Sequence, residues 1–190
     1  NFFEQMIQLC NDNTGLKSFG IKMLVIALEE LPSRSSRRGR DIPLTNARRV
    51  EFQKGIESFL PQIVPTITSM LNDQSVCSIA IDALSSLFSS DYVALQNQVS
   101  GQLMDSLFQI MSNSNHPQCS TVINCLTQMI GRNCIPNDAE GFVMKVATQM
   151  LSTLQSTVDS AKNTGGMLTN MSEDVLLELV RFLTMFLERH

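Results

Sequence analysis

The stretch from Ser75 to Ser89, SVCSIAIDALSSLFS, constrains the fold of this chain more than any other part. In a helix, at about 100° per residue, its polar side chains gather within roughly 60° either side of Asp82. They are Ser75, Ser78, Asp82, Ser85, Ser86 and Ser89. The remaining arc is apolar and far wider than the stripe of a little over about 100° that a surface helix shows. The stretch is therefore predicted to be a helix with packing partners on several sides.

The rest of the chain is also predicted to be helical. Apolar residues recur at helical spacing, and no convincing strand of period two stands between turn signals. Eight helices are predicted, over about 2–10, 16–31, 45–71, 75–89, 100–111, 117–130, 138–161 and 172–188. Pro61 and Pro65 lie inside the third helix. We expect a kink or a break there, because each proline removes a backbone donor and crowds the preceding turn.

The helices pair into four hairpins, at about 1–31, 45–89, 100–131 and 138–190. Their second helices end near Leu31, Phe88, Ile130 and Glu188, with intervals of 57, 42 and 58 residues. HEAT and armadillo repeats run about 40 to 47 residues. The predicted fold is all-α, an α-solenoid of about four stacked HEAT-type hairpins that forms one segment over 1–190. A core helix in another kind of helical domain is the alternative reading of 75–89.

The ends of the chain suggest a piece of a longer protein. It begins at Asn1 with no initiator Met and ends at His190, directly after a strongly apolar helix. Repeat stacks need terminal repeats with polar outer faces. Both ends here are apolar, so we expect the isolated chain to self-associate or to be marginally stable. The longest apolar run, Met23 to Leu28, is far shorter than the roughly 20 residues of a membrane span, and no membrane partner is expected.

Few residues in the sequence suggest chemistry. The two histidines, His116 and His190, have no helix-spaced Cys, Asp or Glu partner that suggests a catalytic triad or a metal site. No glycine-rich phosphate loop is present. The cysteines form no close CxxC pair and are expected to act as small hydrophobic residues; they are Cys10, Cys77, Cys119, Cys125 and Cys134. The sequence predicts no catalytic residue, no metal and no cofactor. An enzyme is the least favoured class.

One stretch is strongly basic although the whole chain has a net charge of −4. Between positions 34 and 54, seven basic residues face Asp41 and Glu51, a local net charge of +5. They are Arg34, Arg37, Arg38, Arg40, Arg48, Arg49 and Lys54. A solvated loop or a contact for an acidic protein surface explains this pattern. Nucleic acid is not the expected partner, because no aromatic residues interleave the arginines.

Several motifs follow one another in a distinctive order. LVIALEELP (24–32) precedes a charged loop, ARRVEFQKGIESFL (47–60) and the serine-rich helix, and then come CLTQMIGRNCIP (125–136), FVMKVATQMLSTLQ (142–155) and LVRFLTMFLERH (179–190). The ordered set resembles the amino-terminal half of the exportins, which belong to the importin-β (karyopherin) superfamily. VCSIAIDALSSLF and RNCIP are most similar to the exportins that carry actin and profilin. The resemblance spans nearly the whole chain, although no single motif is diagnostic.

The resemblance implies a segment of a nuclear export receptor that shuttles between nucleus and cytoplasm. Its expected partners are the Ran GTPase in its GTP form and protein cargo of the actin–profilin kind. In that family the second helix of each hairpin lines the concave face. The matching polar positions here, our candidate protein-binding residues beside the basic ones, are Lys22, Glu29, Asp82, Ser86, Asn124, Gln128, Glu178 and Arg181. The alternative is a generic HEAT or armadillo scaffold for protein–protein interaction without Ran dependence.

Overall fold

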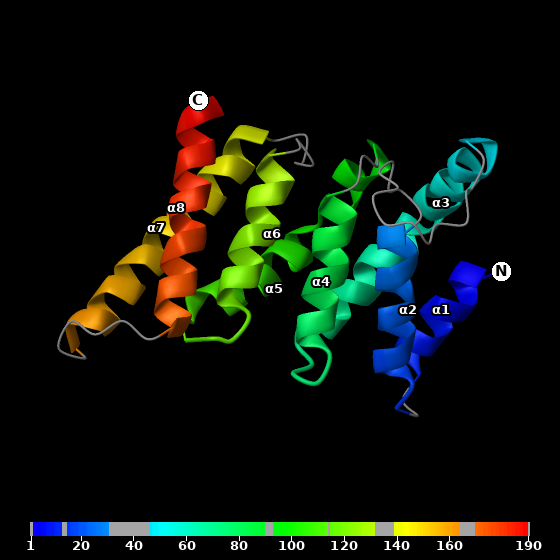
Figure 1. Cartoon of the computed structure of the whole chain (residues 1–190), viewed down its shortest axis with the longest axis horizontal. Helices are drawn as coiled ribbons and strands as arrows, with labels where there is room; N and C mark the ends of the chain where they lie inside the picture. The colour runs from blue at the N-terminus through cyan, green and yellow to red at the C-terminus, as the bar shows by residue number, and fades with distance from the viewer. Residues whose placement is uncertain are drawn as a thin grey trace, which may run out of the picture. The chain divides into compact units, whose positions relative to one another are not determined.

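The computed structural model of the chain describes residues 2–12, 15–30, 46–89, 93–113, 115–131, 139–163 and 170–189 (Figure 1). These residues form eight α-helices and one 3-10 helix, with no strand among them. The predicted all-α class is therefore confirmed. The chain divides into two compact units, Asn1–Gln98 and Val99–His190.

The first unit holds two pairs of helices and a short 3-10 helix. Its elements are α1 (Phe2–Asn11), α2 (Lys17–Glu30), α3 (Asn46–Met70), α4 (Cys77–Phe88) and η1 (Val93–Gln98). Helix α1 packs on α2 and α3, and α4 packs on α2 and α3, while η1 lies against α3. Phe3 stacks on Phe59, with ring centroids 5.8 Å apart, and thereby joins α1 to α3.

Helices α1 and α2 approach each other closely at Gly20. A Cβ atom at this position would lie 2.8 Å from the backbone nitrogen of Cys10 and 2.9 Å from the carbonyl carbon of Leu9. Glycine weakens a helix interior by about 1 kcal/mol relative to alanine. The packing of α1 against α2 compensates for this loss of helix stability, because only a residue without a side chain allows the two helices to lie this close.

Helix α4 is buried around most of its circumference. Ala80, Ile81, Ala83, Leu84 and Leu87 are all 0% exposed. This burial confirms the prediction of a helix packed on more than one side, and α2 and α3 supply two of those sides.

The turn before α4 is organised by Asp73. Its carboxylate accepts hydrogen bonds from the hydroxyl and the backbone N–H of Ser75, at 2.6 and 3.1 Å. It also pairs with the ammonium group of Lys17, at the start of α2, at 3.1 Å. The Ser75 hydroxyl first, and then Lys17, lower the pKa of the Asp73 carboxyl below its usual 3.8. The turn delays the start of α4 to Cys77, two residues after the predicted start.

The lowered pKa of Asp73 predicts a pH-dependent contribution to stability. A carboxyl with a lower pKa in the folded state contributes stability that is fully present above the unfolded pKa and is lost as pH falls through the folded value. We expect Asp73→Asn to flatten the acid end of the stability profile, measured as the urea midpoint against pH. The exposed Asp105 provides the control substitution, Asp105→Asn. Identical acid profiles for Asp73→Asn and the wild type would contradict the prediction.

Helix α3 runs without interruption through both of its prolines. Of the kink or break predicted near 59–64, the break is therefore wrong, and the kink stays a prediction. Pro61 and Pro65 are four residues apart and both exposed, so they share one solvent-facing side of the helix. The opposite side is held by the core residues Leu60, Ile63 and Ile67, all 0% exposed. Packing on this side preserves the helix, and the missing hydrogen bonds fall on the side that water reaches.

The second unit contains two further pairs of helices, α5 (Gly101–Ser112), α6 (Cys119–Gly131), α7 (Ala139–Asn163) and α8 (Asn170–Arg189). Helix α5 packs on α6 and α7, and α8 packs on α6 and α7. The hydroxyl of Ser100 caps α5 by accepting from the backbone N–H of Leu103 at 3.2 Å.

Two helices of this unit begin two residues away from their predicted starts. Helix α6 begins at Cys119 rather than Pro117. A turn centred on His116 precedes it. The ring nitrogen Nδ1 of His116 accepts a hydrogen bond from the backbone N–H of Gln118 at 3.2 Å. The backbone carbonyl of His116 accepts another from the backbone N–H of Cys119 at 3.0 Å. Helix α8 begins at Asn170, two residues before the predicted start at Ser172.

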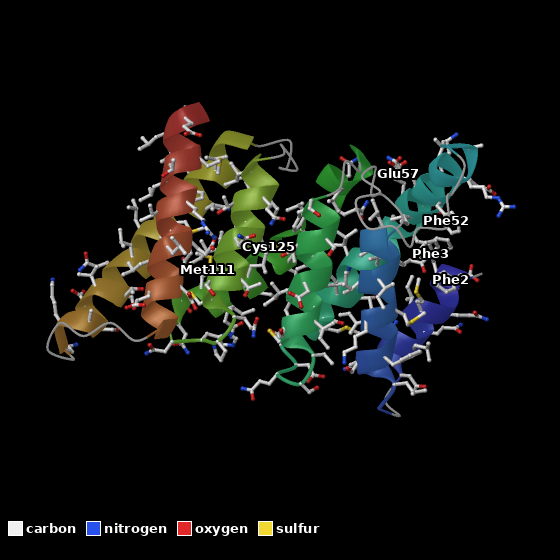
Figure 2. The ribbon with its side chains drawn as sticks, viewed as in Figure 1. Phe2, Phe3, Phe52, Glu57, Met111 and Cys125 are labelled. Carbon is white, nitrogen blue, oxygen red and sulfur yellow. The ribbon has the colours of Figure 1, made fainter. Side chains whose placement is uncertain are left out.

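A buried polar junction joins three helices of the second unit. The hydroxyl of Thr153, on α7, lies 3.2 Å from the backbone carbonyl oxygen of Met111, near the end of α5 (Figure 2). The thiol of Cys119, at the start of α6, lies 3.9 Å from the same oxygen. The end of α5 thus finds donors on both neighbouring helices.

The described cysteines behave as core residues. Cys10, Cys77, Cys119 and Cys125 are free and buried, which confirms their predicted role as small hydrophobic side chains. Burial raises the pKa of the Cys10 and Cys119 thiols to about 11. Both thiols are therefore protonated at neutral pH and poorly nucleophilic. The fifth cysteine, Cys134, lies outside the described residues.

Candidate protein-binding surface

The structure describes three of the predicted second-helix contact residues of the first unit, Lys22, Asp82 and Ser86. Lys22, on α2, and Asp82, on α4, are both exposed. Ser86 was predicted to face a partner, but it is buried, with only 8% of its surface exposed. Its hydroxyl donates to the backbone carbonyl of Asp82 at 3.0 Å. On an otherwise apolar helix, a serine can be buried when its hydroxyl bonds the preceding turn.

Much of the predicted basic surface falls outside the described residues. This applies to Arg34, Arg37, Arg38 and Arg40, and to the side chain of Arg49. The side chain of Glu29, a predicted contact residue of α2, also lies outside the described residues. Of the seven residues in the basic stretch from 34 to 54, the structure describes the side chains of Arg48 and Lys54, which are exposed on the first half of α3.

The four predicted residues of the second unit, in contrast, come together. The amide nitrogen of Gln128 donates to the amide oxygen of Asn124 at 2.7 Å. The amide nitrogen of Asn124 crosses to α8 and donates to the carboxylate of Glu178 at 3.1 Å. The guanidinium of Arg181 pairs with the other oxygen of that carboxylate. We name these four residues the α6–α8 polar strip.

The carboxylate of Glu178 sets the orientation of the whole strip. An ionised carboxylate only accepts hydrogen bonds, so Asn124 turns its amide nitrogen to Glu178 and its oxygen to Gln128. Gln128 therefore donates its amide nitrogen to Asn124. Its amide oxygen is buried without a hydrogen-bond partner in the described structure. The side chain of Glu178 is 12% exposed, whereas that of Arg181 is 58% exposed. The strip thus has a fixed, shielded carboxylate and an accessible cation.

A shallow hollow lies beside the strip, between α6 and α8. Its volume is about 240 Å³, and its walls are Ser120, Thr121, Asn124, Asp174, Leu177 and Glu178. Leu177 is 50% exposed. Small-molecule sites usually measure about 300 to 1,000 Å³. A hollow of this size suits one protein side chain better than a metabolite.

The sequence identified the strip but missed most of the hollow. Asp174 and Glu178 lie four residues apart on α8, and Ser120 and Asn124 lie four apart on α6, so each pair shares a helix face. This spacing was a usable signal within each helix. Only the packing of α6 on α8 brings the two faces together, and spacing along one helix does not contain that information.

Two further properties of the described residues bear on function. They contain no group of three or more His, Cys, Asp or Glu placed to hold a metal ion. None of their helices is long and apolar enough to cross a membrane. Comparisons of the chain with protein-family models, with curated proteins and with solved structures gave no match.

Proposed function

We propose that this chain is a segment of a nuclear export receptor, built as an α-solenoid of about four HEAT-type hairpins. It binds Ran-GTP and protein cargo, such as actin–profilin, through polar strips on the second helices of its hairpins. The single observation that carries the proposal is the α6–α8 polar strip. Four residues chosen from the sequence as partner-facing positions form one connected surface across two helices.

The packing within each unit supports a repeated hairpin. In the first unit the first helices α1 and α3 are in contact, and so are the second helices α2 and α4. In the second unit α5 contacts α7 and α6 contacts α8 in the same way. Stacked helical repeats have this pattern, because each hairpin lies beside the equivalent helices of its neighbour.

The proposed binding mode is a broad polar contact rather than a deep pocket. Arg181 offers an accessible cation to the partner, and the hollow receives one side chain of the partner. Glu178 pairs with Arg181 and also forms one wall of the hollow. Each partner favours one curvature of the solenoid. Ran-GTP and cargo would therefore raise each other's affinity, because binding of one removes part of the conformational cost of the other.

The test is a titration of the 190-residue chain with Ran loaded with a non-hydrolysable GTP analogue or with GDP. We expect tighter binding to the GTP form. Glu178→Gln should weaken that binding by about tenfold, a change of about 1.4 kcal/mol, since the neutral amide no longer pairs with the charge of Arg181 and keeps only one acceptor oxygen for Arg181 and Asn124 together. Glu188→Gln, an exposed position on the same helix, is the matched control. Failure to bind either form, or equal affinity for both, would leave the generic scaffold as the better description.

A further inference from the structure

The hollow between α6 and α8 has one acidic wall and one neutral wall. Of the residues that line it, Asp174 and Glu178 on α8 carry carboxylates, and none carries a positive charge. Helix α6 contains no charged residue anywhere from Cys119 to Gly131. A group that enters the hollow therefore meets negative charge on the α8 side and neutral polar groups on the α6 side.

The two carboxylates are not equally available to a partner. One oxygen of Glu178 accepts from Asn124, and the other pairs with Arg181. Asp174 is exposed and lies one turn before Glu178, on the same face of α8. Because Arg181 balances only one of the two negative charges, the hollow keeps one unit of unbalanced negative charge, and Asp174 presents it to solvent.

The amino end of α8 does not by itself account for these two acids. A helix favours negative charge at its amino end mainly within the first turn. In α8 that position is occupied by Glu173, whereas Asp174 and Glu178 follow the first turn. Both instead border the hollow, together with residues of α6, the helix that lies beside α8 (Figure 1). Their placement therefore points to a contact across the two helices.

The other walls of the hollow suit the remainder of a long basic side chain. Leu177 is 50% exposed and provides apolar surface, on which the methylene stem of a lysine or an arginine can pack. Ser120 and Thr121 are half-buried, and their hydroxyl oxygens have lone pairs that accept from an ammonium or a guanidinium group. The hollow thus combines an acidic wall, neutral acceptors and an apolar surface.

We propose that the hollow binds one basic side chain, a lysine or an arginine, of a protein partner. The cationic group lies between Asp174 and Glu178, and its methylene stem lies on Leu177. Arg181 stays paired with Glu178, so the new cation pairs mainly with Asp174. This inference rests on the proposed function, because the hollow belongs to the same binding surface, and it adds the chemistry of the partner's contact residue.

The experiment uses small probes in place of a whole partner. N-acetyl-lysine amide and N-acetyl-arginine amide are titrated into the 190-residue chain, and its backbone amide resonances are followed by NMR. We expect both probes to shift the resonances of Ser120, Thr121 and Leu177 in a saturable way, with a dissociation constant of about 1 mM or weaker for ligands of this size. N-acetyl-norleucine amide, which has a similar stem without the charge, should leave these resonances unchanged.

A substitution of Asp174 tests the charge that carries the proposal. Asp174→Asn, at an exposed position, should weaken the binding of both basic probes by about tenfold, because it removes the unbalanced charge. Glu188→Gln, exposed on the same helix but away from the hollow, is the matched control and should leave their affinity unchanged. No shift at the hollow with either basic probe would overturn the proposal. So would equal binding of the norleucine probe, or full affinity in Asp174→Asn.

These results can be separated from the Ran titration. A chain that binds the basic probes but neither form of Ran would keep this inference and lose the proposed function. A chain that prefers Ran-GTP and does not respond to the basic probes would keep the proposed function and lose this inference.

Discussion

Truncation of Leu84 to alanine is expected to destabilise the chain by about 2 to 5 kcal/mol. Leu84 is 0% exposed and lies in the middle of α4, the helix buried around most of its circumference. Removal of its side chain forfeits the burial of three carbon atoms and leaves a cavity among rigid neighbours. Packed helices on more than one side of α4 restrict the collapse that would otherwise reduce the cost.

Urea unfolding followed by circular dichroism measures this effect. Leu177→Ala is the matched control, because Leu177 is 50% exposed and also helical. Its replacement should change the free energy of unfolding by no more than about 0.5 kcal/mol. A loss below about 1 kcal/mol for Leu84→Ala would show that α4 is not packed as the structure describes.

The second large effect is expected at Gly20. Alanine is the better helix former by about 1 kcal/mol, so propensity alone predicts that Gly20→Ala stabilises the chain. We expect the opposite, a loss of about 1 to 3 kcal/mol, because the added Cβ would lie less than 3 Å from three atoms of α1, two of them backbone atoms. Backbone atoms of a packed helix cannot rotate away as a flexible side chain can.

The same substitution at Gly55 provides a control with the opposite sign. Gly55 also lies inside a helix, but the nearest atom to an added Cβ is a ring carbon of Phe3 at 3.7 Å, an ordinary contact. Gly55→Ala should therefore raise stability by up to about 1 kcal/mol. Thermal or urea unfolding of the two variants measures whether each substitution raises or lowers the free energy of unfolding. Equal effects in the same direction would contradict the close approach of α1 and α2.

The helical class and most helix positions could be predicted from the sequence, because apolar periodicity records which face of each helix is buried. The wide apolar arc around Leu84 predicted burial on several sides, and α4 has it. The break at Pro61 and Pro65 was predicted wrongly because local rules omit the packing that holds the far side of α3. Ser86 was misplaced for a similar reason, since a serine that bonds its own helix backbone loses much of its preference for water.

The candidate site was predictable only in part. The polar positions Asn124, Gln128, Glu178 and Arg181 could be selected because each lies on a polar arc of its helix. Their connection through Asn124 and Glu178 depends on how α6 meets α8, and that contact joins residues 54 positions apart. No local pattern specifies such a pairing. For the same reason the hollow beside the strip could not be predicted, because its walls come from both α6 and α8.

The prolines of α3 also affect how the first unit responds to force. The carbonyls of Glu57 and Pro61 have no backbone N–H four residues later, because Pro61 and Pro65 lack one. Bending the helix to open this side breaks fewer hydrogen bonds than bending an uninterrupted helix does. Helix α3 therefore bends most easily near its middle, and in the direction that makes its solvent side convex and moves its ends toward the core.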